Sequence, residues 1–149
     1  MKFNLKVILL GGLAYYVGQF VTSMLSAPFI HEGILAETYT ATAVFWRPEL
    51  MADDMAALMP RWITTGLIAA FIQACIYDNF RSLLNGSGVV KGIKFGLVAF
   101  LFYFCFSIGF SGIFNLPETV WLWWSVEAIL YFIVGGAAMG FVVSKLSSD

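Results

Sequence analysis

The chain has 149 residues and a formal net charge of −1, with 60% hydrophobic and only 11% charged residues. Soluble domains average roughly 45–50% apolar and about 25% charged residues, so this composition is typical of an integral membrane protein, here one membrane domain over residues 1–149. A nucleic-acid-binding role is excluded, because the sequence has no basic patch or stripe.

The first apolar segment, residues 6–28, is predicted to cross the membrane as a helix. A crossing helix needs about 20 apolar residues, and this stretch is longer than the roughly 7–15 apolar residues of a signal peptide. Pro28 and Gly33 are expected to end it. Polar side chains spaced four, three and four residues apart share one face of this helix, namely Tyr15, Gln19, Thr22 and Ser26. We expect that face to point into the bundle or toward a partner subunit, because lipid would leave the Gln19 amide unpaired.

The segment 31–59 is predicted to be a structured outer loop. Pro48 is suited to the first turn of a short helix, whose apolar residues are Leu50, Met51, Met55, Leu58 and Met59. The opposite, acidic face consists of Glu49, Asp53 and Asp54. This pattern predicts either an amphipathic helix that lies along the membrane interface or a cap that packs over the bundle.

His31 is the only histidine, and in this loop it is expected to be solvated or to cap a helix. Together with Glu32 and Glu37 it is a weak candidate for a metal site, since one histidine and two carboxylates lack the ligand spacing of a zinc motif. We therefore predict no metal and no cofactor.

Three further apolar segments are long enough to cross a membrane: residues 62–80, 93–114 and 119–142. Pro60 precedes the first of them, and NGSG at 85–88 and NLP at 115–117 separate it from the next two. Long apolar runs without a period-two alternation favour helices over barrel strands. We predict an all-α integral membrane protein, a bundle of four transmembrane helices.

The basic residues predict the orientation of the bundle. Six of them fall on one side of the four-span arrangement, namely Lys2, Lys6, Arg81, Lys91, Lys94 and Lys145. Only Arg47 and Arg61 fall on the other side. Because cytoplasmic loops carry an excess of lysine and arginine, we expect both termini in the cytoplasm and the chain in a bacterial inner (plasma) membrane.

Glu127 is an acid in the middle of the fourth apolar segment, where we expect it near the bilayer midplane. An ionised carboxylate at that depth is costly and usually faces the bundle interior, a partner or a water-filled cavity. One interpretation is a site for a proton, a cation or a substrate; the other is a neutral acid that donates a hydrogen bond between helices. The candidate polar partners are Tyr15, Gln19, Gln73, Tyr103 and Ser107, with Tyr131 one turn along the same face.

The fourth segment also carries a cluster of small residues. Gly136 and Gly140 form a GxxxG pattern, and Gly135 extends its surface. Such a surface allows two helices to approach closely, either within the chain or in a homodimer. Near the start of this segment, Trp121, Trp123 and Trp124 are expected at the outer interface, where aromatic residues anchor membrane helices.

The sequence has no P-loop, no GxGxxG with a following acid and no GxSxG, so we predict no enzymatic activity and name no catalytic residue. Two hypotheses remain. The first is a transport or channel-like protein with a polar, proton-sensitive site around Glu127. The second is a non-catalytic accessory or assembly subunit, or a binder of a lipid or hydrophobic ligand. Both imply membrane lipid as a partner, and a homo-oligomer or another membrane protein would enlarge the small bundle.

Overall fold

The computed structural model describes residues 4–51 and 55–146, and all the regular structure in these ranges is helical. The elements in chain order are α1 (Leu5–Phe29), a π-helical turn (Ile30–Ile34), α2 (Ala36–Ala41), a 3-10 turn (Ala43–Phe45), α3 (Pro48–Met51), α4 (Met55–Phe80), a 3-10 turn (Arg81–Leu83), α5 (Gly88–Ser111) and α6 (Glu118–Leu146). Four of the helical stretches are long and apolar enough to cross a membrane: Leu5–Ile34, Ala56–Leu83, Gly88–Ser111 and Glu118–Leu146. The predicted set of four long apolar helices is confirmed.

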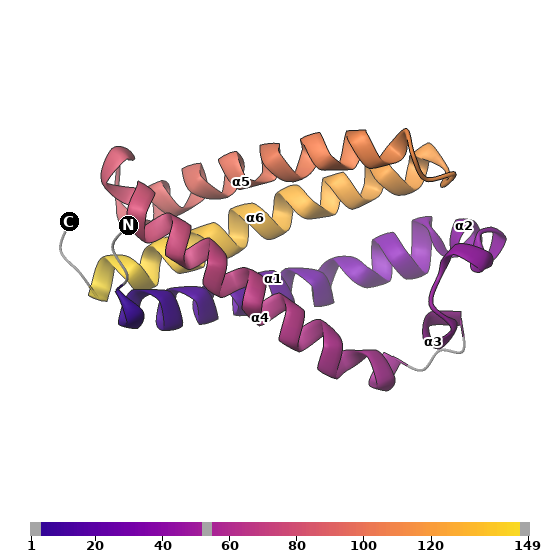
Figure 1. Ribbon diagram of the computed structural model, residues 1–149, viewed down its shortest axis with the longest axis horizontal. Coiled ribbons are helices and arrows are strands. Elements are labelled where there is room, and N and C mark those ends of the chain that lie inside the picture. The colour runs from indigo at the N-terminus through magenta and orange to yellow at the C-terminus, as the bar shows by residue number, and fades with distance from the viewer. Residues whose placement is uncertain (1–3, 52–54, 147–149) are drawn as a thin grey trace.

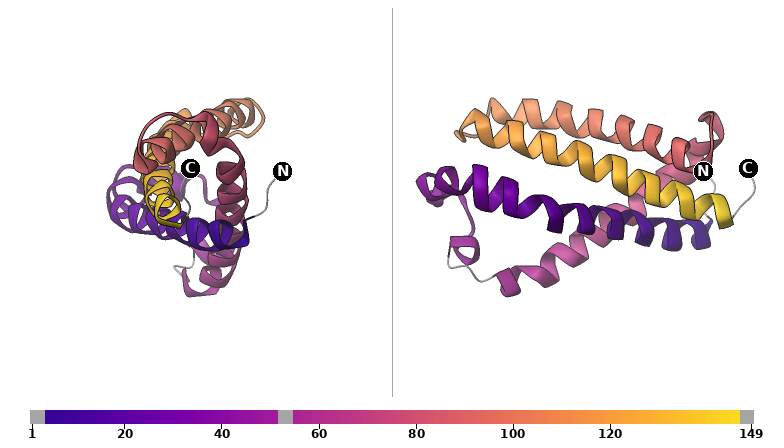
Figure 2. Two further views of the ribbon diagram at one scale, coloured as in Figure 1. Left: turned by 90° about the vertical axis from the view of Figure 1, so that its left-hand side faces the viewer. Right: turned by 180° about the vertical axis from the view of Figure 1, so that it is seen from behind.

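Helix α6 is the central helix of the bundle and lies between α1 and α5 (Figures 1 and 2). In the most apolar stretch of α6, 39% of the residues are buried, compared with 11% in that of the span containing α4. Helix α4 crosses α1 at an angle and diverges from α5 and α6 (Figure 1). The start of α1, the turn between α4 and α5 and the end of α6 lie together; we call this the terminal end. Helices α2 and α3 and the turn between α5 and α6 lie at the opposite end, which we call the loop end (Figure 1).

Two prolines that were predicted to lie at helix boundaries lie inside helices. Pro28 lies inside α1, and the chain continues beyond it into the π-helical turn, in which the Leu35 amide donates to the Ile30 carbonyl at 2.8 Å. Pro60 lies inside α4, which begins at Met55. The prediction was wrong because a proline near a helix end removes only one backbone donor and leaves one carbonyl of the preceding turn unpaired.

The structure describes two parts of the predicted amphipathic helix of the outer segment, namely α3 (Pro48–Met51) and the first residues of α4 from Met55. The prediction of one amphipathic helix is not confirmed. Asp53 and Asp54, on the predicted acidic face, lie outside the described residues, as do the side chains of Met51 and Met55 and the whole of Lys2.

Helices α5 and α6 pack backbone against backbone. On α5 the glycines recur every four residues, namely Gly88, Gly92 and Gly96. A Cβ atom added at Gly92 would lie 2.0 Å from the carbonyl oxygen of Gly136, and one added at Gly140 would lie 2.2 Å from the carbonyl oxygen of Gly88. The GxxxG pattern predicted on α6 therefore packs within the chain, against a second glycine series that the sequence analysis overlooked.

Helices α1 and α6 also approach closely, at Gly18 and Gly135. A Cβ atom added at Gly18 would lie 3.1 Å from the Gly135 Cα atom. Gln19 and Tyr15 lie over Gly135, where an added Cβ would meet both side chains at 3.0–3.1 Å. The polar face predicted for the first helix thus packs on α6 over these positions.

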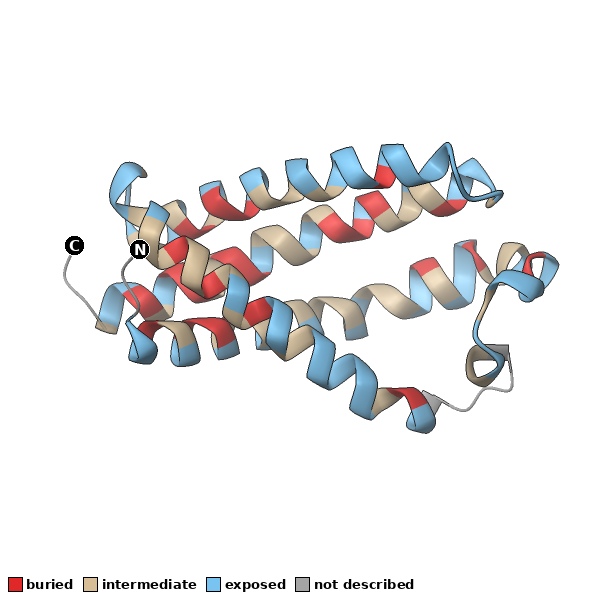
Figure 3. Ribbon diagram, in the orientation of Figure 1, coloured by how far each residue is buried: buried red, intermediate tan, exposed pale blue. Residues whose placement is uncertain are grey.

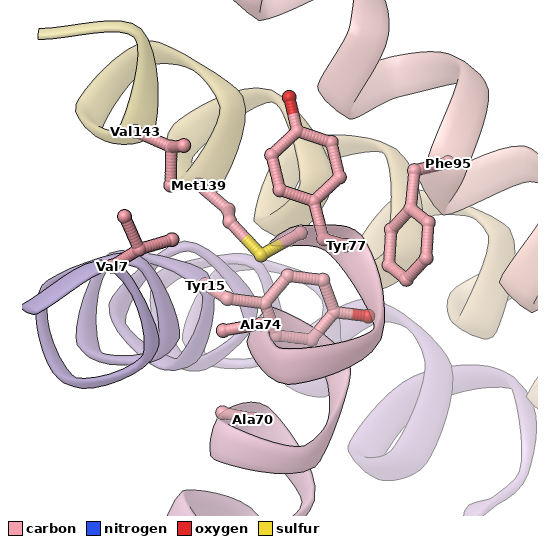
Figure 4. Close-up of a cluster of buried hydrophobic side chains, with 8 residues drawn as sticks. All are labelled: Val7, Tyr15, Ala70, Ala74, Tyr77, Phe95, Met139 and Val143. Atoms are coloured by element: carbon pink, nitrogen blue, oxygen red, sulfur yellow. The ribbon is translucent and has the colours of Figure 1, made fainter. Parts of the chain in front are cut away.

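The hydrophobic core lies in the half of the bundle nearer the terminal end (Figures 3 and 4). It consists of Val7, Tyr15, Ala70, Ala74, Tyr77, Phe95, Met139 and Val143. Side chains from α1, α4, α5 and α6 meet there, and the Tyr77 and Phe95 rings contact edge to face at 5.3 Å. Much of the remaining apolar surface is exposed on the outside of the four long helices (Figure 3).

Candidate functional site

A polar cluster surrounds Glu127, whose side chain is buried between α6 and α1. Glu127 is only 4% exposed and lies in the half of α6 nearer the loop end. One carboxyl oxygen, Oε2, lies 2.9 Å from His31 Nε2, and the other, Oε1, accepts a hydrogen bond from the Ser26 hydroxyl. Both partners come from the last turns of the first helical segment. The site therefore lies toward the loop end and not at the middle of the bundle.

The π-helical turn brings His31 to this position. In an α-helix with 3.6 residues per turn, two residues five positions apart point about 140° away from each other. Ser26 and His31 have this separation, yet both contact Glu127. The wider turn at Ile30–Ile34 adds a residue to the helical repeat and rotates His31 toward α6. Short π-helical segments are frequent at functional sites for this reason.

His31 connects the buried acid with the surface. The His31 side chain is 31% exposed, whereas that of Glu127 is 5% exposed. Among the described residues, the other close ion pairs are Arg81 with Asp78 at 3.1 Å and Arg47 with Glu49 at 3.9 Å. The basic partner of the buried acid is thus a histidine, the side chain that ordinarily changes charge between pH 5 and 8. His31 thus lies between the buried carboxyl of Glu127 and the surface of the protein.

The second nitrogen of His31 is held by an aromatic cluster. His31 Nδ1 lies 2.7 Å from the Tyr39 hydroxyl, which accepts a hydrogen bond from Trp124 Nε1 at 2.8 Å. The Tyr39 ring packs edge to face on Trp46 at 5.0 Å. Burial raises the pKa of the Tyr39 hydroxyl above its ordinary value, the hydrogen bond from Trp124 lowers it, and the charge of Glu127 raises it further. Tyr39 therefore keeps its proton at neutral pH.

These contacts define one consistent set of donors. When Glu127 is ionised, its carboxylate can only accept, and His31 Nε2 then carries the hydrogen. In the neutral imidazole, Nδ1 is then the acceptor for the Tyr39 hydroxyl, whose oxygen accepts from Trp124. When a second proton binds His31, Nδ1 becomes a donor to the Tyr39 oxygen. In that state the Tyr39 hydroxyl hydrogen, which otherwise points to Nδ1, has to turn away from His31.

The structure brings together only part of the predicted polar site. Tyr131 lies beside the acid: its hydroxyl interacts with Glu127 and donates to the Ser23 hydroxyl at 3.4 Å. Gln19 and Tyr15 lie further toward the terminal end, over Gly135. The buried Tyr15 hydroxyl has no hydrogen-bond partner among the described residues.

Two other predicted partners of Glu127, Tyr103 and Gln73, lie on α5 and α4. Tyr103 is on α5, where its ring packs on Phe132 at 6.0 Å and its hydroxyl interacts with Ser107. Gln73 is on α4 and lines a largely apolar cavity of about 260 Å³ that extends to α5. Neither residue has a hydrogen bond to Glu127 in the described structure.

His31 lies in the π-helical turn and not in the loop that the sequence predicts, because the chain remains helical through Pro28 and Gly33. Its side chain is partly exposed and also contacts Glu127. Glu32 and Glu37 are exposed, and no group of three acidic, cysteine or histidine side chains suited to a metal occurs in the described part of the chain. The sequence signal for His31 was a lone histidine five residues after a serine that shares the polar face of the first helix.

Trp124 also differs from the simple interfacial anchor that its position suggested. Its indole nitrogen is turned inward to Tyr39, and its ring packs on Trp46 at 5.7 Å. A small second core of Ile30, Leu35 and Val120 packs beneath these aromatic rings. No family model matches the chain, and neither a curated protein nor a solved structure shows detectable similarity to it.

Proposed function

We propose that the chain is an integral membrane protein with the loop end outside and the terminal end in the cytoplasm. Large apolar side chains cover the outside of the helices, for example Phe102, Phe106 and Ile108, which are 67%, 65% and 57% exposed. Soluble proteins rarely expose such extensive apolar surface, whereas lipid solvates it. The basic residues concentrate at the terminal end, which supports a cytoplasmic location for that end.

Within this membrane protein, we propose a transport or channel-like activity in which His31 and Glu127 form one proton-binding unit. The observation that carries the proposal is the pairing of a buried acid with a partly exposed histidine at 2.9 Å. A lysine or arginine partner would keep its charge at every physiological pH, whereas the histidine gains or loses charge there. The pair therefore couples protonation from the outer solution to a group inside the bundle.

Polar groups continue from this unit along the contact between α1 and α6. Ser23 and Tyr131 follow directly, and Gln19 and Tyr15 come next toward the terminal end. Beyond Tyr15 the core of Met139, Val143 and the neighbouring apolar side chains fills the interior. The polar contacts therefore extend from His31 toward Tyr15 and stop at an apolar core on the side that we assign to the cytoplasm.

Proton flux in liposomes tests this function. Purified protein is reconstituted with a trapped pH indicator, and a pH gradient is imposed in the presence and absence of candidate cations. Wild type is expected to dissipate the gradient faster than empty liposomes, and Glu127→Gln is expected to abolish the difference, because glutamine retains hydrogen bonding but cannot carry charge. Glu37→Gln removes an exposed carboxylate of α2 and should behave as wild type. Equal rates for wild type and Glu127→Gln would refute the proposal.

A non-catalytic accessory or lipid-binding role is the second candidate. It is favoured by the apolar cavity of about 260 Å³ between α4 and α5, lined by Ile76, Phe80, Leu84 and Phe102 among others. In this case both wild type and Glu127→Gln are inert in the flux assay, and both co-purify with the same membrane lipid or protein.

A further inference from the structure

Gln73 is a primary amide on α4 that has no hydrogen-bond partner among the described residues. Its side chain is half-buried and lines the cavity of about 260 Å³ between α4 and α5, where its neighbours are apolar, for example Ile76, Val98 and Phe102. Val98 and Phe102 are 49% and 67% exposed, so the cavity opens to the outside of the bundle. The amide therefore faces a surface that the rest of the chain leaves uncovered.

Gln73 lies deep within its spanning helix. The span Ala56–Leu83 continues for ten residues beyond Gln73 toward the terminal end and for 17 residues toward the loop end. At about 1.5 Å per residue, roughly 15 and 25 Å of helix separate the amide from the two ends, which is further than a glutamine side chain can reach. Acyl chains offer neither donors nor acceptors at this depth, so lipid would leave the amide unpaired.

Helix α4 is placed to contact another molecule at this face. Only 11% of the apolar stretch of its span is buried, the lowest value of the four spans, and the helix diverges from α5 and α6 (Figure 1). Its inward face is already used, because Ala70 and Ala74 are fully buried in the core. One turn before Gln73 lies Ala69, which is exposed and small enough for a second helix to approach closely.

The partner at this face has to supply a polar group at the depth of Gln73. A second copy of the chain in the same orientation does so, because a two-fold axis along the membrane normal brings each residue to the depth of its own copy. A primary amide is also self-complementary, since its carbonyl oxygen accepts and its NH2 group donates, so two Gln73 side chains can pair with each other. Hydrogen bonds of this kind favour the association of membrane helices.

We propose that the chain forms a parallel homodimer in which the α4 helices of the two copies meet at Gln73. The two amides pair, the Ala69 side chains face the contact, and apolar side chains of the second copy fill the cavity between α4 and α5. This inference rests on the membrane location proposed above but not on proton movement, so the flux assay and the association assay can fail independently.

Association in liposomes tests the dimer. Copies of the full chain with donor and acceptor fluorophores are reconstituted together, and energy transfer is measured as lipid is added to dilute the protein. Gln73→Leu should weaken association about tenfold, the order of magnitude of an interhelical hydrogen bond in a membrane. Gln19→Leu is the matched control, because it makes the same change where the side chain packs over Gly135 within the chain, and it should associate as wild type does.

Cysteine cross-linking locates the contact, after Cys75 and Cys105 are replaced by alanine. Ala69→Cys is on the face of Gln73, whereas Ile68→Cys is exposed on the same helix but points about 140° away from Gln73. Mild oxidation should cross-link Ala69→Cys to its copy and leave Ile68→Cys monomeric. Adding Gln73→Leu to Ala69→Cys should reduce the cross-linked fraction, and circular dichroism should show unchanged helix content, because Gln73 is outside the core.

Three results would each overturn the proposal: a monomeric wild type, unchanged association in Gln73→Leu, or equal cross-linking of Ala69→Cys and Ile68→Cys. A monomer that retains a lipid in the cavity would assign this face to lipid instead, as in the second candidate function.

Discussion

Replacing Gly92 by alanine should separate α5 from α6. The added Cβ would lie 2.0 Å from the Gly136 carbonyl oxygen and 3.0 Å from the Gly140 Cα atom, whereas ordinary contact begins at 3.4 Å. The helices must therefore part by roughly 1.4 Å, the difference between 3.4 and 2.0 Å. Both clashing groups are backbone and cannot rotate away. A gap of about 1 Å already removes up to half of the dispersion energy of a contact, so we expect the loss to reach about 3 kcal/mol, the upper range for overpacking.

The assay is unfolding of the purified protein in mixed micelles with increasing dodecyl sulfate, followed by circular dichroism. Gly109→Ala is the matched control, because it lies on the same helix and an added Cβ there meets nothing within 4 Å. Alanine is also the better helix former, so this variant should be as stable as wild type or slightly more stable. The account of helix packing is refuted if the two variants unfold at the same denaturant concentration.

Three other predictions concern α1, the π-helical turn and α2. Gly18→Ala should destabilise less than Gly92→Ala in the same assay, because its Cβ would lie 3.1 Å from the nearest atom, and an equal or larger loss would contradict the comparison. His31→Ala should cost about 2 kcal/mol of unfolding free energy, below the range for a fully buried pair because Ser26 still donates to Glu127; an unchanged stability would show that the pair contributes nothing. Burial raises the pKa of Tyr39, because the folded state favours the neutral hydroxyl. The contribution of this hydroxyl to folding stability is therefore complete below pH 10 and is lost as the pH rises further. The tyrosinate absorbance that Tyr39→Phe removes should accordingly appear above pH 10, and its appearance below that pH would contradict the burial of the hydroxyl.

The sequence was sufficient to predict the four long helices, because long apolar runs without alternation have few other structures open to them in lipid. Helix ends were harder to predict. Pro28 and Pro60 each remove one backbone donor, and whether a helix stops there depends on what its next turn packs against. At Pro28 the following residues Ile30 and Leu35 are buried beneath aromatic rings, and this tertiary packing keeps the chain helical.

The candidate site was predicted in part, for a related reason. Glu127 stands out in any apolar segment, and Tyr131 follows from helical spacing alone. The position of His31 does not follow from helical spacing, because its contact with Glu127 depends on one π-helical turn. No periodicity in the sequence reveals that turn. The glycine series of α5 was in principle visible, since Gly88, Gly92 and Gly96 have the same four-residue spacing as the GxxxG pattern on α6.

The protonation of His31 tests the central claim most directly. Because His31 is the only histidine in the chain, nitrogen NMR of untagged protein labelled at histidine reports this one side chain as the pH is changed. In the neutral imidazole we predict hydrogen on Nε2 and none on Nδ1, because Nε2 faces the Glu127 carboxyl and Nδ1 faces the Tyr39 hydroxyl. Glu127→Gln, whose amide can donate as well as accept, should weaken this preference. A neutral imidazole with its hydrogen on Nδ1, or the same tautomer populations in wild type and Glu127→Gln, would contradict a shared proton-binding unit.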